Sequence, residues 1–239
     1  MLIKACLNGS REAGAHPTLP LTPDELARDA RAVVAAGAGA LHIHPRRADG
    51  SQSLAAADIA AALSAIRTYC PGVPVGVSTG IWIEPVVALR LRQVQEWTVL
   101  PDFASVNFSE PGVAELCEAL TTSGVNIEAG LATVADVELL HKLGLADHCL
   151  RILIEPPESE PEAALANATA IINVLNAAHI QKPRLLHGSD AATWAVLDLA
   201  ISLGYDTRIG LEDTFTLPNG HQTQGNAELV TLVYNKVTL

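Results

Sequence analysis

Short apolar segments alternate with longer segments rich in alanine and leucine along the whole chain, and this alternation constrains the fold most. Aromatic residues make up only 4% of the chain, so small and branched aliphatic side chains must fill its interior, which suits parallel strands buried on both faces. We expect strands over residues 2–8, 40–44, 73–79, 102–108, 125–131, 149–156, 184–188 and 207–213. We expect helices over residues 22–36, 55–69, 84–97, 113–123, 134–143, 161–179, 190–203 and 226–236.

Each predicted strand is followed by a helix, with units repeating at roughly 30-residue spacing. Strands that alternate with helices imply parallel pairing, and eight such units favour a closed (β/α)₈ TIM barrel, for which about 200–250 residues is a usual length. No linker or break in composition divides residues 1–239, so we expect one domain. An open doubly wound sheet is the alternative, although no G-x-G-x-x-G motif follows the first strand.

The composition excludes several classes of partner. The formal net charge is −11 and no cluster of Lys and Arg occurs, so a nucleic-acid partner is not expected. No apolar run is long enough to span a bilayer and the N-terminus lacks a signal-like apolar core, so we expect a cytoplasmic protein without a membrane partner. The four cysteines show no C-x-x-C spacing, which argues against a disulfide framework or a cysteine zinc site.

The clearest chemical signal is the pair His42 and His44 at the end of the second predicted strand. Residues two apart in a strand project to the same side, so both imidazoles point in one direction. Two neutral imidazoles at this spacing suit zinc, cobalt, manganese or iron. The alternative is a pair of hydrogen-bonded histidines at a strand end. In (β/α)₈ barrels the active site lies at the C-terminal ends of the strands, where this pair also lies.

Glu212, near the end of the eighth predicted strand, is a third candidate ligand. Closing the barrel places strands eight and two on either side of strand one, and alternate strands contribute to the same interior layers. Arg208 and Glu212 are expected to share one face of their strand, with Glu212 at the rim. Two histidines and a glutamate with an open fourth position form a catalytic zinc set. The alternative is a polar strand end that caps the next loop.

Further polar residues follow the other predicted strands. Asp213 is a candidate base, which a metal ion and the arginine of its strand would keep ionised. Ser78, Thr79 and Gly80 precede a predicted helix, where hydroxyl and backbone N–H groups can hold a carboxylate or can serve as an ordinary cap. Residues 187–190 offer a similar anion-binding turn or a helix cap.

Six segments together make the chain resemble the β-keto acid cleavage enzymes of the 3-keto-5-aminohexanoate cleavage type: LTPDELA, LHIHPR, VGVSTG, ASVNF, RIGLEDT and NAELV. The resemblance runs from about Lys4 to Val230, and HIHPR with RIGLED is specific when found in this order. It implies a zinc-dependent barrel, with another divalent transition metal as an alternative to zinc.

The resemblance implies an acyltransferase reaction in which a β-keto acid exchanges with acetyl-CoA, the co-substrate, to give acetoacetate and a new acyl-CoA. The metal would polarise the keto oxygen, and a metal-bound enolate would attack the thioester before a retro-Claisen step. By position in the motifs, the resemblance assigns His42, His44 and Glu212 to the metal, and Asp213 with Arg208 to proton abstraction.

The resemblance also implies substrate-binding positions. Ser78 would contact the substrate beside Thr79 and Gly80, and either Ser105 or Asn107 at the end of the fourth strand would help to hold it. The chain is shorter than typical members after the fourth strand and within the fifth to seventh. A homo-oligomer is expected from the resemblance and from the alanine-rich outer helices.

Arg11 stands about where the best-known members have an acidic residue that suits an amino-bearing substrate. The sequence therefore predicts a substrate with an uncharged or anionic tail, unless Arg11 is only an exposed loop residue. Three other functions stay open: a hydrolase of the amidohydrolase type, a metal-dependent aldolase or lyase without CoA, and a shortened metabolite-binding paralogue. The first is disfavoured because the H-x-H pair lies on strand two rather than strand one.

Overall fold

The computed structural model describes residues 1–238, along which strands and helices alternate. The strands are β1 (Ile3–Cys6), β2 (Ala40–Ile43), β3 (Val75–Ser78), β4 (Phe103–Asn107), β5 (Asn126–Leu131), β6 (Cys149–Ile154), β7 (Arg184–Leu186) and β8 (Asp206–Ile209). The helices are α1 (Pro23–Ala35), α2 (Ala56–Tyr69), α3 (Val87–Gln95), α4 (Val113–Thr122), α5 (Val134–Leu143), α6 (Pro161–Ala177), α7 (Thr193–Ser202) and α8 (Asn226–Thr238). Two short 3₁₀ turns, Ala146–His148 and Asp190–Ala192, precede β6 and α7.

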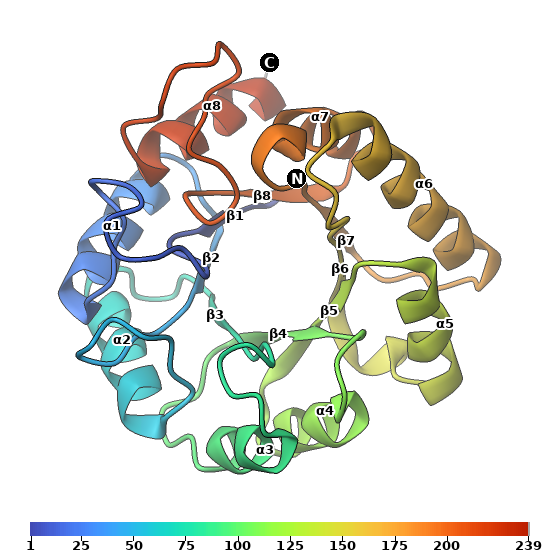
Figure 1. Cartoon of the computed structure of the whole chain (residues 1–239), viewed down its shortest axis with the longest axis horizontal. Coiled ribbons are helices and arrows are strands. Elements are labelled where there is room, and N and C mark those ends of the chain that lie inside the picture. The colour runs from blue at the N-terminus through green and yellow to red at the C-terminus, as the bar shows by residue number, and fades with distance from the viewer. Residues whose placement is uncertain (239) are drawn as a thin grey trace.

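The eight parallel strands form a closed barrel in chain order, and the helices surround it as an outer ring (Figure 1). β8 pairs with β1, where Lys4 lies opposite Arg208, and β1 pairs with β2, where Cys6 lies opposite His42. This closure confirms the (β/α)₈ TIM barrel and shows that the open doubly wound sheet is wrong. The closure also places β8 and β2 on either side of β1, as the predicted metal site of His42, His44 and Glu212 requires.

The predicted segments differ from the structure mainly at their ends. α3 begins at Val87 rather than at residue 84, because the preceding residues form a turn and loop. β8 ends at Ile209 rather than at residue 213, because the backbone N–H groups of Asp213 and Thr214 both turn back to the carbonyl of Gly210, at 2.9 and 3.1 Å. The expectation that Glu212 shares a strand face with Arg208 is therefore wrong.

The layer between barrel and helices is apolar. Alternate strand side chains point outward against the helices, and many are fully buried, such as Leu41 and Val77. α1 shows how local sequence fixes a helix end: Thr22 accepts from the backbone N–H of Glu25 at 3.3 Å, and the Glu25 carboxylate accepts from Thr22 at 2.9 Å. This capping box, with Pro23 in the first turn, starts the helix at a defined residue.

The barrel interior, by contrast, carries buried charges. Lys4 and Arg151 both pair with Glu128, the latter at 3.3 Å, and the Lys4 and Glu128 side chains are fully buried. The Phe103 ring lies 5.6 Å from the Lys4 ammonium and 5.3 Å from the Arg151 guanidinium. Gly76 makes room for this ring, because a Cβ there would come within 2.0 Å of it. These groups form a floor of buried charges beneath the C-terminal end of the barrel.

None of the helices in the described part of the chain combines the length and hydrophobicity needed to cross a bilayer. The four cysteines are buried and free, which fits the absence of a disulfide framework among them. The assignment of residues 1–239 to one domain and the cytoplasmic location stay predictions.

Candidate active site and metal centre

His42, His44 and Glu212 converge at the C-terminal end of the barrel. The Nε2 atoms of the two histidines lie 3.2 Å apart, and Glu212 places its carboxylate oxygens 3.9 Å from His42 Nε2 and 3.7 Å from His44 Nε2. One ligand atom from each residue falls within 4.8 Å of the other two. The imidazole pair and the carboxylate therefore lie close enough together to share one metal ion.

The turn after β8, rather than the strand, delivers Glu212 to this point. The chain passes very close to β1 there, since a Cβ at Gly210 would come within 1.9 Å of the Cys6 carbonyl oxygen. Gly9, with a φ of +53°, leaves the space that the Glu212 side chain fills, because a Cβ at Gly9 would come within 2.3 Å of Glu212 Cγ. Two glycines on different segments thus set the position of one candidate ligand.

The hydrogen bonds around the histidines fit a cation. His42 Nδ1 lies 3.4 Å from Ser105 Oγ, which donates its proton to the Glu128 carboxylate at 2.7 Å and so offers its lone pairs to the ring. His44 Nδ1 lies 2.6 Å from the side-chain oxygen of Gln52. With both Nδ1 atoms facing acceptors, both Nε2 lone pairs face each other and Glu212, whose Oε2 is buried without a hydrogen-bond partner. A divalent ion held here would satisfy all three groups.

The pKa shifts of His42 and Glu212 fit metal binding by these residues. Burial lowers the pKa of His42 well below its ordinary value, against the opposing effect of Glu212, so the ring is neutral and able to ligate. Burial raises the pKa of Glu212, but the positive charge of Arg208 is the largest opposing effect, and the pKa lies well below the ordinary value. Arg208 contacts Glu212 Oε1 at 2.9 Å. The Glu212 carboxylate is thus ionised while the His42 imidazole is neutral.

Asp213 lies beside the cluster with one oxygen held and the other free. Its Oδ1 accepts from Arg208 Nη2 at 2.7 Å, and its Oδ2 is buried without a hydrogen-bond partner. Burial raises the pKa of Asp213 above the ordinary value, although Arg208 opposes this. His187 Nδ1 lies 3.5 Å from Oδ1. A buried carboxylate with a raised pKa and one oxygen without a hydrogen-bond partner has the properties of a general base.

The predicted carboxylate-binding segment ends β3 but does not precede a helix directly, because α3 begins later. Ser78 is buried and accepts from the backbone N–H of Gly80 at 3.3 Å, while the Thr79 hydroxyl donates to the Ser105 carbonyl at 2.8 Å. A Cβ at Gly80 would come within 2.3 Å of the Trp82 ring. The Thr79 hydroxyl is thus committed to the neighbouring strand, and the roles of all three residues in substrate binding stay predictions.

Ser105 and Asn107 occupy different positions on β4. The Ser105 hydroxyl lies beneath the metal site, between Glu128 and His42. Asn107 lies nearer the rim, donates to Glu110 Oε1 at 2.9 Å, and directs its side-chain oxygen toward Gly130, where a Cβ would approach it to 2.9 Å. Of the two, Asn107 is the better placed to meet a substrate, and its role stays a prediction.

The structure places Arg11 at the edge of the site. Its guanidinium donates to Asp190 Oδ1 at 2.6 Å and to the Glu212 carbonyl at 3.2 Å, and it stacks on the Phe215 ring at 4.7 Å. These contacts tie the loop after β1 to the turn that carries Glu212. The role of Arg11 in choosing the substrate tail stays a prediction.

The sequence reasoning missed Glu155 and the inward position of His187. Glu155 follows β6, which lies across the barrel from β2, and its Oε2 lies 3.6 Å from His187 Nε2. Burial raises the pKa of Glu155 to about 7 and lowers the pKa of His187 to about 3. The available signal was the polar EPPE segment that ends an otherwise apolar predicted strand.

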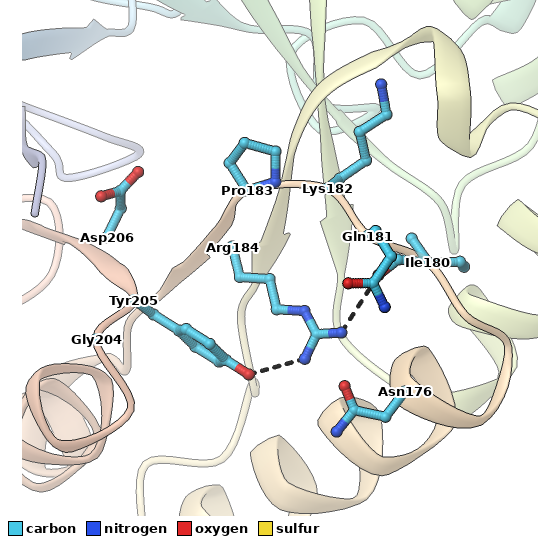
Figure 2. Close-up of a pocket in the computed structure, with 9 residues that line it drawn as sticks. All are labelled: Asn176, Ile180, Gln181, Lys182, Pro183, Arg184, Gly204, Tyr205 and Asp206. Atoms are coloured by element: carbon cyan, nitrogen blue, oxygen red, sulfur yellow. Dashed lines mark hydrogen bonds between the residues drawn. The ribbon is translucent and has the colours of Figure 1, made fainter.

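A pocket of about 540 Å³ lies at the opposite end of the barrel, around the N-terminal ends of β7 and β8 (Figure 2). Arg184 is one of the residues that line this pocket. The Arg184 guanidinium donates to the Tyr205 hydroxyl at 2.8 Å and to the Ile180 carbonyl at 3.3 Å. Its charged group is already engaged within the fold, and in barrels of this kind that end serves stability rather than chemistry.

The fold and the site define a TIM-barrel protein with a candidate two-histidine, one-glutamate metal centre at the catalytic end of the barrel. The sequence profile of the beta-keto acid cleavage enzyme family matches residues 1–152 and 159–238, and the chain belongs to that family. It is accordingly an enzyme of the class that cleaves β-keto acids.

Two curated proteins that are similar to the chain along most of its length are named as enzymes of this kind. The chain is 25% identical to the 3-keto-5-aminohexanoate cleavage enzyme of Fusobacterium nucleatum subsp. nucleatum, over 96% of this chain and 88% of that protein. It is 22% identical to the enzyme of the same name from Acetoanaerobium sticklandii, over 96% of this chain and 89% of that one.

Among solved structures, ObcA matches with a TM-score of 0.77 at 17% identity, over 93% of this chain. The chain spans about 62% of the length of ObcA, so this likeness concerns the barrel fold. ObcA has also been solved in a binary complex with oxaloacetate and in a ternary complex with a C4-CoA adduct and oxalate.

Proposed function

We propose that this enzyme exchanges a β-keto acid with acetyl-CoA, giving acetoacetate and a new acyl-CoA, at a zinc ion held by His42, His44 and Glu212. The observation that carries the proposal is the free Oδ2 of Asp213, buried beside three groups that can share one divalent ion. A bound ion would supply Lewis-acid polarisation of the keto oxygen. The protein would supply the base, its orientation and the substrate contacts.

Asp213 takes the proton from the carbon between the ketone and the carboxylate, because Oδ2 is its only oxygen free of Arg208. Arg208 holds the carboxylate through two N–H groups, at 3.1 and 2.7 Å from Oδ1, and fixes the direction of the free oxygen. The activated carbon then attacks the thioester carbonyl of acetyl-CoA. The C–S bond of acetyl-CoA breaks as the acetyl group joins this carbon, and CoA leaves as a thiolate. In the retro-Claisen step the thiolate adds to the original keto carbon, and the bond from that carbon to the activated carbon breaks. The original acyl group leaves on the CoA sulfur, and the acetoacetate carbon takes back the proton from Asp213.

The substrate would lie between the metal centre and the far wall of the barrel. Ser78, with Thr79 and Gly80 beside it, would border the substrate on the β3 side. Asn107 would hold it on the β4 side, whereas Ser105 would act by orienting His42. ObcA supports the choice of substrates, because that neighbour has been solved with a β-keto acid and with a CoA adduct.

The direct test is a screen of β-keto acids with acetyl-CoA and the zinc-loaded protein, in which acetoacetate and the new acyl-CoA are followed by mass spectrometry. We expect both products in equal amounts and no turnover when acetyl-CoA is omitted. Turnover without acetyl-CoA would instead indicate an aldolase or lyase. If no substrate reacts and the α-protons of acetoacetate do not exchange with deuterium oxide, the chain binds metabolites without catalysis.

A further inference from the structure

Gln52 links His44 to an aromatic residue of another loop. Its side-chain oxygen lies 2.6 Å from His44 Nδ1 and 3.2 Å from Trp82 Nε1. Gln52 is half-buried in the loop after β2, whereas Trp82 belongs to the turn after β3 and is 49% exposed. The two rings lie nearly parallel, with centroids 6.4 Å apart and planes 19° apart.

The chemistry of these groups leaves one arrangement of protons. An indole N–H can only donate, so the Gln52 atom that faces Trp82 must be the carbonyl oxygen rather than the amide nitrogen. Because His44 Nδ1 faces the same oxygen, which can only accept, Nδ1 must carry the proton. The lone pair of His44 is therefore on Nε2, the atom that lies 3.2 Å from His42 Nε2 and faces Glu212.

Trp82 is itself fixed by the turn that carries it. Its ring covers Gly80, where a side chain would come within 2.3 Å of it. The turn is anchored below by Glu110, which accepts from the backbone N–H of Ile81 at 3.0 Å and pairs with the buried Arg90. The indole N–H is consequently held toward Gln52.

We propose that Trp82 and Gln52 act as a tautomer latch: the Trp82 N–H fixes the orientation of the Gln52 amide, which holds His44 in the Nδ1-protonated form that can bind a metal. Both are positioning residues, and the inference rests on the proposed metal centre. Without the indole N–H, the Gln52 amide is free to turn over and donate to Nδ1. Nε2 would then carry the proton and could not ligate.

Three variants test the latch. Trp82→Phe keeps a ring over Gly80 but removes the N–H, and Gln52→Met keeps the length of the side chain but removes the acceptor. We expect each to weaken Co²⁺ binding by about 10–100-fold, the usual cost of losing an outer partner of a metal-binding histidine. Gln52→Glu combined with Trp82→Phe should restore most of the affinity, because a carboxylate oxygen accepts from Nδ1 whichever way it turns.

The readouts are the Co²⁺ dissociation constant, measured by competition with a chelator, and the ¹⁵N shifts of the His44 ring in the metal-free protein. Trp194→Phe is the matched control, because its indole donates to the Thr216 carbonyl instead, at 2.8 Å. We expect the His44 proton on Nδ1 in wild type and shared between both nitrogens in Trp82→Phe. Unchanged affinity and shifts in Trp82→Phe would overturn the latch alone. A wild-type protein that binds no Co²⁺ would overturn the metal centre and the purpose of the latch with it.

Discussion

Arg208 holds only one of the two carboxylate oxygens of Asp213. Its Nε and Nη2 atoms lie 3.1 and 2.7 Å from Oδ1, and Oδ2 is buried without a partner. An ion pair made for stability alone would gain from engaging both oxygens, because an unpaired buried acceptor costs free energy. The unused oxygen is therefore the feature that the proposed proton transfer explains.

Replacing Asp213 by Asn removes the base and keeps the shape of the side chain. We expect the exchange of the α-protons of acetoacetate to slow by about 10²–10⁴-fold, the usual contribution of a general base, with little change in metal content. Deuterium incorporation followed by NMR measures this rate. Asp198→Asn, at an exposed position, is the matched control. Wild-type exchange in Asp213→Asn would show that another group takes the proton.

Replacing Arg208 by Lys keeps the positive charge but loses the two-point contact with Asp213. Burial would then raise the pKa of Asp213 further, because the main group that opposes it is weakened. The base must be ionised to act, so we expect the acidic limb of the kcat/KM profile to move to higher pH. An acidic limb that stays in place would separate Arg208 from the titration of the base.

A substitution at Gly9 tests whether this glycine sets the position of Glu212 in the candidate metal site. Gly9→Ala would place a Cβ within 2.3 Å of Glu212 Cγ, so the ligand must move and metal affinity should fall at least tenfold. Gly50→Ala is a close control, since Gly50 also has a positive φ, of +85°, but nothing lies within 4 Å of the added Cβ. Both variants should lose about 1–2 kcal/mol of stability from backbone strain. Equal metal affinity in the two would contradict the role given to Gly9.

The raised pKa of Glu155 predicts that this residue makes the folded protein less stable as the pH rises. Its pKa is raised from an ordinary value of 4.5 to about 7, so between these values the folded protein holds a proton that the unfolded chain has lost. The contribution of Glu155 to stability is therefore greatest below pH 4.5 and is lost as the pH rises to about 7. Relative to wild type, Glu155→Gln should gain about 2–3 kcal/mol between pH 5 and pH 8.

Urea unfolding at the two pH values measures this difference. Glu118→Gln, at an exposed position on α4, controls for the change in net charge. Comparison of the variants is needed because the lowered pKa of His187 acts in the opposite direction over part of the same range. Parallel curves for wild type and Glu155→Gln would contradict the raised pKa.

The sequence alone predicted the barrel because each β/α unit carries its own local signals, and their number and order leave little choice of topology. The positions of His42 and His44 followed from the two-residue period of a strand. Glu212 was predicted to be near them for a partly wrong reason. The chain leaves β8 at Ile209, and a turn closed onto Gly210 carries the side chain inward.

What the sequence did not reveal depends on contacts between distant segments. The link from Trp82 through Gln52 to His44 joins two loops of the barrel rim, and neither loop has a periodic pattern that reports where its side chains point. Glu155 reaches the site because Gly130, on the neighbouring strand, has no side chain to block it. Such close approaches are set by packing in three dimensions, which a single sequence does not display.

Anomalous diffraction from crystals of the zinc-loaded protein, recorded on both sides of the zinc absorption edge, tests the central claim most directly. We expect one strong peak bonded to His42 Nε2, His44 Nε2 and the Glu212 carboxylate, with Asp213 Oδ2 beside it and not ligated. A zinc-loaded crystal with no peak among these three residues, or with Glu212 turned away from a metal held elsewhere, would contradict the proposed centre and the chemistry assigned to it.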